Sequence, residues 1–339
     1  MLRPAYRIVV GDKVVDTTVE AKASTAIELT VRLDLDTPAD SVTLRQGQVG
    51  GLRAQPGDEL SVDLGYADED QQLFRVLTGS VVAVEPGLEV KRITGHSGGG
   101  KLLKTFVDKT FEDTTAGDIV RALASEAGIE VDTVEDGPPF PAYVVDGRRP
   151  IARHLRDLAY LAGFDTYVTA DGKLVFEGFS GNRTVHKLKY GEHVLAAELQ
   201  RVSPRAGTVQ VWGDSPGSGG DESWAWLTKD FGPRHGTSGT TKPMLLIERP
   251  AVRTSKLAAA VAASAAETLT EQALRGRVRI QGRPQLFLGD LIRLEGFPDK
   301  AGVDELEGTY QVRGVRHQLT KAGGLITDVE FRSLQGVAP

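Results

Sequence analysis

Hydrophobic and polar positions alternate along the first part of the chain. The period-two pattern is clearest in residues 27–33 (IELTVRL) and 79–84 (GSVVAV), where β-branched side chains are frequent. Such alternation is typical of short, half-buried strands. Turn sequences separate the strands, as at Pro56-Gly57-Asp58 and Pro86-Gly87. Residues 1–95 are therefore predicted to form a small antiparallel barrel or sandwich.

The pattern changes to a helical period in the middle of the chain. Residues 115–128 begin with a T-x-x-D capping box and place apolar side chains on one helical face. Residues 150–163 carry a similar apolar stripe between a proline and a glycine, which favour a helix start and a helix end. The dipeptide Asp171-Gly172 is typical of a tight β-hairpin. We therefore expect residues 96–200 to form an α+β middle domain.

The third segment has a different composition. Residues 213–243 are rich in Gly, Ser and Pro and hold Trp224 and Trp226 among charged residues. Two interpretations stay open: a long loop, or a loop that becomes ordered against a partner through the tryptophans. Residues 201–253 are therefore assigned to a connecting strand and this loop. Residues 254–339 are predicted to form a capped helix and a second strand-rich barrel.

The two strand-rich segments share a skeleton. Gly57-Asp58 opens an alternating strand that is followed by a second strand at Gly79, and Gly289-Asp290 opens a strand that is followed by one at Gly308. Many strands after turns begin with Gly-Asp, so the similarity can also arise without a repeat. As a repeat, it predicts two similar barrels with the α+β part inserted between them. Three such chains would present six similar units around an axis.

Composition and charge exclude several classes of function. The chain of 339 residues has 40 basic and 46 acidic side chains, a net charge of −6, which does not suit a nucleic-acid surface. It has no cysteine, so disulfides, zinc–thiolate sites and thiol nucleophiles are excluded. The N-terminus lacks the apolar core of a signal peptide, and no stretch is long enough to span a membrane. We therefore expect a cytoplasmic chain without direct membrane insertion.

Charged residues are unevenly distributed. Acidic side chains concentrate between residues 56 and 74, and arginines recur along residues 275–283. The alternatives are two solvated faces, or acidic loops that meet basic strands of a neighbouring subunit and fix its register. The candidate interface residues are Asp58, Glu59, Asp63, Asp68, Arg277, Arg279, Asp290, Trp224 and Trp226.

Motifs that could indicate catalysis are incomplete. Residues 95–101 have the spacing of a phosphate-binding loop, but Leu102 stands where a hydroxyl would bind Mg²⁺. Gly213-Asp214-Ser215 is similar to the nucleophile block of one hydrolase family, but its partner motifs are missing. The histidines lack the i, i+4 spacing of a helical metal site. No catalytic residue, cofactor or metal ligand is therefore assigned.

Taken in order, the motifs resemble the phage late control gene D family of baseplate hub proteins. The resemblance covers about residues 45–332, and the order of its short motifs is more specific than any one of them. It is carried by PGD at 56–58, TGSV at 78–81, FEDTTAGDIV at 111–120, LRDLA at 155–159, GFD at 163–165, GKLVF at 172–176, GRP at 282–284, LGD at 288–290, GTYQV at 308–312 and VRH at 315–317.

The resemblance implies a mainly β, α+β fold with two similar small antiparallel β-barrels and an inserted α+β domain. It also implies a non-enzymatic homotrimer that adapts a hexameric inner tube protein to a trimeric spike protein and contacts other baseplate proteins. Such a chain would be assembled in the cytoplasm into a phage-tail-like injection particle or a virion baseplate.

Two functions of other classes remain as alternatives. One is a tail-associated, envelope-degrading hydrolase that uses His96, Asp214 or Ser215. The other is a carbohydrate-binding module in which Trp212 and the two loop tryptophans stack on sugars.

Overall fold

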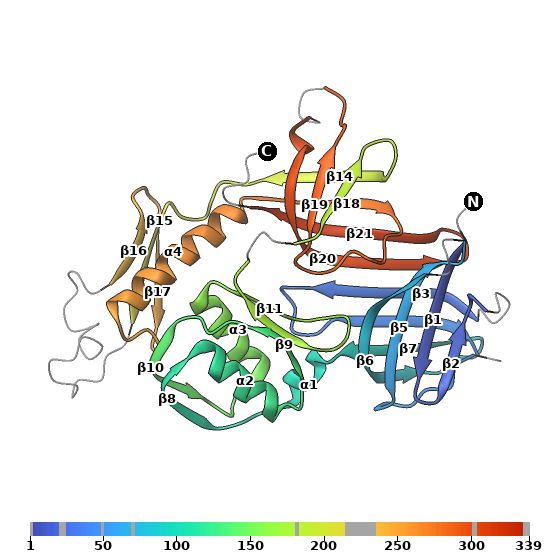
Figure 1. The fold of residues 1–339 in the computed structure, drawn as a ribbon, viewed down its shortest axis with the longest axis horizontal. Helices are drawn as coiled ribbons and strands as arrows, with labels where there is room; N and C mark the ends of the chain where they lie inside the picture. The colour runs from blue at the N-terminus through green and yellow to red at the C-terminus, as the bar shows by residue number, and fades with distance from the viewer. Residues whose placement is uncertain are drawn as a thin grey trace.

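The computed structural model describes residues 3–19, 25–48, 51–68, 72–179, 183–213, 235–299 and 304–334. Strands dominate these residues, and the helices gather beside one part of a long curved sheet (Figure 1). The predicted mainly β fold with an α+β part is therefore confirmed. No helix among the described residues is long and apolar enough to cross a membrane.

The N-terminal strands form a connected antiparallel sheet. They are β1 (Pro4–Val10), β2 (Lys13–Asp16), β3 (Ala26–Asp34), β4 (Ser41–Gly47), β5 (Glu59–Tyr66), β6 (Leu73–Glu85) and β7 (Val90–Ser97). Their order in the sheet is β3-β4-β7-β6-β5-β1-β2. In β4 every second residue is buried, which is the pattern of a strand with one face on a core. The predicted alternating strands at residues 27–33 and 79–84 are confirmed as parts of β3 and β6.

Helices and short sheets make up the middle of the chain. Its elements are α1 (Gly99–Lys104), β8 (Lys109–Thr115), α2 (Ala116–Glu126), β9 (Val131–Val134), β10 (Pro139–Val145), α3 (Ile151–Ala162), β11 (Asp165–Val168) and β12 (Leu174–Glu177). The capping box is present, since the Thr115 hydroxyl accepts a hydrogen bond from the Asp118 amide at 3.2 Å. Gly163 ends α3 with a φ of 73°. Both predicted helices and the Asp171-Gly172 hairpin are confirmed.

The C-terminal elements return to the long sheet. They are β13 (Val185–Lys189), β14 (Val194–Arg201), β15 (Thr208–Gly213), β16 (Gly236–Gly239), β17 (Met244–Arg249), α4 (Ser255–Glu271), β18 (Leu274–Gln281), β19 (Leu291–Glu295), β20 (Gly308–Thr320) and β21 (Gly324–Ser333). The sequence pattern assigns residues 185–200 to the middle domain. In the structure, however, β13 pairs with β19 and β14 pairs with β18.

Two sets of six strands repeat the same order. We call β1 and β3–β7 the N-terminal unit, and β13, β14 and β18–β21 the C-terminal unit. The first runs β3-β4-β7-β6-β5-β1 across the sheet and the second runs β14-β18-β21-β20-β19-β13. One pairing differs, because β1 is antiparallel to β5 whereas β13 is parallel to β19. The shared skeleton thus extends over both units, while closure of each unit into a barrel stays a prediction.

The buried apolar residues form two clusters. One cluster is continuous through both units, with Leu29, Val31 and Val62 on the N-terminal side and Val315 and Phe331 on the C-terminal side. The other combines α2, α3 and the middle strands with α4 and β15. Figure 1 shows α4 lying alongside β15, β16 and β17, next to the middle elements. The helices therefore share a core of their own, beside the sheet.

Truncation of a core residue in α3 tests this packing. Leu158→Ala removes a fully buried side chain, so we expect a loss of about 2–5 kcal/mol in the free energy of unfolding. Val144→Ala on β10 is the control, because Val144 is exposed, and its effect should stay within about 0.5 kcal/mol. Urea titration followed by circular dichroism measures both. Equal effects of the two variants would contradict the assigned core.

Candidate assembly surfaces

The Gly-Asp turn of the N-terminal unit is held by four hydrogen bonds. Gly57 has a φ of 101°, a conformation that favours glycine. Its amide donates to the Val81 carbonyl at 2.8 Å, and the Val81 amide donates to the Asp58 carbonyl at 2.9 Å. The Asp58 carboxylate accepts from the Gln55 amide at 2.8 Å, and the Asp58 amide donates to the Gln55 carbonyl at 3.1 Å. Asp58 therefore shapes the entry into β5.

The C-terminal unit repeats these contacts. Gly289 has a φ of 80°, its amide donates to the Val312 carbonyl at 3.1 Å, and the Val312 amide donates to the Asp290 carbonyl at 2.8 Å. The Asp290 carboxylate accepts from the Phe287 amide at 2.9 Å and lies 3.0 Å from His186 Nε2. The repeat predicted from the two Gly-Asp sequences is thus confirmed at the level of single hydrogen bonds.

The remaining acidic candidates lie on or beside β5. Asp63 is buried and forms an ion pair with Arg75 of β6. Asp68 is exposed and accepts a hydrogen bond from the Arg3 amide. Glu59 is exposed at the start of β5. Of the acidic candidates, Glu59 and Asp68 are the ones whose exposure leaves them accessible to a second molecule, and their role at an interface stays a prediction.

The two basic candidates form ion pairs with another residue of the same chain. Arg277 and Arg279 on β18 both reach Asp328 on β21, with nitrogen–oxygen distances of 2.7 Å for each arginine. Burial raises the pKa of Asp328, but the hydrogen bonds from the two arginines outweigh it and hold the pKa below its ordinary value. Replacing both arginines by Glu would leave three carboxylates together, so that change would weaken the sheet itself. An intermolecular role of these arginines stays a prediction.

Several of the residues predicted for binding or catalysis lie outside the described part of the chain, whereas Trp212 is on β15 and its ring stacks on His235. Those outside it are Trp224, Trp226, Asp214 and Ser215. His96, the other residue of the hydrolase alternative, lies on β7, where burial and Lys104 lower its pKa. Within the described residues no three His, Asp or Glu side chains gather as a metal site would require.

Pairing of β3 with β20 joins the two units. Seven register positions connect them, from Gly314 opposite Asp34 to Thr320 opposite Glu28. The Gln318 amide nitrogen donates to the Glu28 carboxylate across this seam at 3.0 Å. All strands of both units thereby belong to one 13-stranded sheet.

A buried ion-pair cluster lies at one end of the seam. Arg313 at the bulge in β20 is only 12% exposed, and its guanidinium lies 2.6 Å from Asp165 of β11 and 2.7 Å from Asp36 after β3. Nearby, Arg332 lies 3.1 Å from Glu271 at the end of α4. Burial raises the pKa of Asp165, but the charges of Arg313 and Arg332 outweigh this effect and hold the pKa below its ordinary value. The cluster connects both units, the middle elements and α4.

The charges of this cluster are far apart in the chain, so no sequence motif connects them. One local signal was present: Arg313 stands in β20 between two buried residues, Val312 and Gly314. A cation in such a position needs a buried anion, but the sequence does not say which one. Asp165 and Asp36 could be identified only after the fold brought them together.

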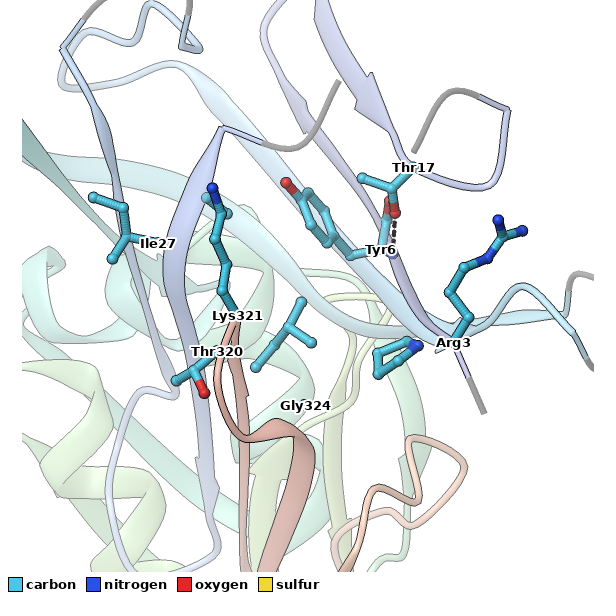
Figure 2. Close-up of a pocket in the computed structure, with 10 residues that line it drawn as sticks. Arg3, Tyr6, Thr17, Ile27, Thr320, Lys321 and Gly324 are labelled. Carbon is cyan, nitrogen blue, oxygen red and sulfur yellow. Dashed lines mark hydrogen bonds between the residues drawn. The ribbon is translucent and has the colours of Figure 1, made fainter. Parts of the chain in front are cut away.

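A small cavity marks the other end of the seam. It has a volume of about 260 Å³ and lies between the start of β1, the start of β3 and the β20–β21 turn. Figure 2 shows Arg3, Tyr6, Ile27 and Lys321 around it. Among the described residues that line it there is no carboxylate and no imidazole. Because its lining comes from both units beside the β3–β20 pairing, the cavity is a feature of the contact between them.

Proteins similar to this chain are found by comparison of structures and not by comparison of sequences. No family model matches the chain, and a search of curated proteins finds no relative. The prophage MuSo2 43 kDa tail protein from Shewanella oneidensis is similar in structure, with a TM-score of 0.74, 16% identity, and coverage of 97% of this chain and 98% of that one. A tail protein from Neisseria meningitidis MC58 also has a TM-score of 0.74, with 15% identity and coverage of 99% and 98%.

The chain has the fold of phage tail proteins. A third similar structure is the E. coli c3393 protein, described as a component of the type VI secretion system with structural similarity to the T4 bacteriophage tail proteins gp27 and gp5. Its TM-score is 0.60 at 10% identity, with coverage of 92% of this chain and 74% of that one. The tail-protein fold implied by the sequence resemblance is thus confirmed.

Removal of the buried cation tests the cluster. Arg313→Met leaves the buried Asp165 carboxylate without its nearest cation, so we expect a loss of about 3–5 kcal/mol in the free energy of unfolding. Arg293→Met is the matched control, because its ion pair with Glu295 is exposed and should contribute less than about 1 kcal/mol. Chemical denaturation compares the two. The double variant Arg313→Met with Asp165→Leu should recover stability; a further loss would contradict the proposed cause.

The buried Asp40, near the seam, should make the free energy of unfolding depend on pH. Burial raises its pKa to about 7, and its carboxylate accepts from the Asp34 amide at 3.0 Å. Between about pH 4 and 7 the folded chain therefore binds a proton that the unfolded chain releases, so stability falls as the pH rises. Asp40→Asn keeps the acceptor oxygen but not the titration. The stability difference between wild type and variant should therefore change between pH 4 and 7; a constant difference would contradict the assignment.

Proposed function

We propose that the chain is a structural baseplate hub of a contractile tail or injection particle. In this proposal three copies form a ring that adapts a hexameric inner tube to a trimeric spike. The chain acts through its interfaces and not through catalysis.

The repeated strand order is the observation that carries this proposal. Each chain holds two six-strand units with the same order and the same hydrogen-bonded Gly-Asp turn. Three chains therefore hold six similar units, so a threefold assembly can present nearly equal surfaces to a sixfold ring. A single unit per chain would not provide this match.

The similar structures support a tail role for the fold. Two of them are tail proteins, and the third is a secretion-system component similar to tail proteins. Their sequence identities are low, so these structures support the fold alone. The proposed trimer, tube partner and spike partner rest on the repeat and on the sequence resemblance. Assembly in the cytoplasm, before incorporation into the particle, belongs to the same proposal.

A hub of this kind must transmit force without changing shape. The β3–β20 pairing and the Arg313 cluster tie the two units together, so a load on one unit reaches the other through hydrogen bonds and ion pairs. Contacts between copies must be comparably strong. Obligate interfaces of this type usually bury more than about 2,000 Å².

The mass of the purified chain tests the trimer. We expect a species of three times 36.4 kDa in native mass spectrometry and light scattering, and a ring with six peripheral lobes in averaged electron micrographs. The six lobes follow from two similar units in each copy. A monomer or dimer, or a trimer with only three lobes, would overturn the proposal.

A further inference from the structure

The edge strands β3 and β14 of the two units correspond to each other, and each has a β-bulge at the equivalent position. In β3 the register against β4 shifts between Ala26 and Glu28, which leaves Ile27 as an extra residue. In β14 the register against β18 shifts between Val194 and Ala196, which leaves Leu195. Because β3 and β14 hold the same place in the strand order, β14 is the counterpart of β3 in the C-terminal unit.

The long central strands correspond in the same way. The register of β6 against β7 shifts after Val81, and the register of β20 against β21 shifts after Val312. These two valines also accept the equivalent hydrogen bonds from Gly57 and Gly289. Residues 83–85 of β6 therefore correspond to residues 314–316 of β20.

The two units differ in what covers these edges. In the C-terminal unit, residues 314–320 of β20 pair with β3 of the N-terminal unit. In the described structure β6 pairs only with β5 and β7, so the matching edge at Ala83–Glu85 has no strand against it. Likewise β14 has β18 as its only partner strand among the described residues and forms the outer edge of the sheet (Figure 1). Open strand edges expose amides and carbonyls that can pair with another chain.

We propose that the edge at Ala83–Glu85 of one copy pairs with β14 of the next copy, as β20 pairs with β3 within one chain. This inference rests on the proposed trimer. Carrying the internal register across places Val84 opposite Arg201 and Glu85 opposite Gln200 of the neighbour. Three internal and three intermolecular seams would then alternate around a closed ring.

Side chains at both edges suit this contact. Glu85 pairs with Arg92, and Arg201 pairs with Glu305; all four side chains are well exposed. Pairing would place Glu85 directly opposite Gln200, whose side-chain amide can donate a hydrogen bond to the Glu85 carboxylate. Pro86 has no amide hydrogen and follows directly, so the strand pairing would be shorter than the internal one.

Exposed leucines provide an apolar part of the proposed seam. Leu195 is 62% exposed on β14, and Leu88 is fully exposed after β6. By position they correspond to Ile27 and Leu319, which line one cavity at the internal seam. Large apolar side chains left in water at both edges are consistent with a partner that covers them.

Disulfide trapping tests the register, and the absence of native cysteine makes the experiment clean. The variant Glu85→Cys with Gln200→Cys places thiols directly opposite each other in the proposed seam, on side chains that are exposed in one copy. Mild oxidation should give covalent trimers on a non-reducing gel. Directly opposed residues of antiparallel strands are close enough to be bridged.

Two matched variants serve as controls. Arg32→Cys with Arg316→Cys is the equivalent pair at the internal seam and should form its disulfide within one chain, at monomer mass. Glu85→Cys with Leu199→Cys is one residue out of register, so its thiols point to opposite faces and should not link.

The outcomes separate this inference from the proposed function. Trimers that cross-link with the first pair but not with the offset pair support the seam. Trimers by native mass that do not cross-link, or that link equally with the offset pair, overturn the seam and leave the trimer standing. If no trimer forms under reducing conditions, both proposals fail.

Discussion

The antiparallel pairing of β3 with β20 is the interaction on which the rest of the structure depends. It connects residues at opposite ends of the sequence and turns two sheets into one. Its register is strongly specified, since a slip of one residue would move Leu29, Val31 and Leu33 from the core to the other face. The orientation of one unit against the other follows from this single seam.

Buried charges then fix the inserted elements to the seam. Asp165 belongs to the middle part and Glu271 to α4, and their partners Arg313 and Arg332 come from the C-terminal unit. A charged pair that is removed from water is costly unless its geometry is satisfied, so alternative placements of the inserted elements would be penalised. Packing of apolar residues alone would be less selective.

The two units show how a repeat can tolerate large insertions. The helical middle part follows β7, and β15–β17 with α4 lie between β14 and β18, yet the order of the six strands is the same in both units. Insertion occurs at connections and leaves the hydrogen-bonded strands intact. The charged residues expected to bind a neighbour are partly used within the chain: Asp58 and Asp290 shape turns, and Arg277 and Arg279 bind Asp328. These charges therefore already have partners within the chain.

Local features of this protein were determined by the sequence itself. The capping box at Thr115, the helix end at Gly163, the Asp171-Gly172 turn and the two Gly-Asp turns depend on neighbouring residues, so their patterns could be interpreted directly. The partners of β3, β13 and β14, and the anions around Arg313, were decided only by the tertiary structure. The physical reason is that alternation shows that one face of a strand is buried, and a buried cation shows that an anion is near. Neither identifies which distant segment provides the partner.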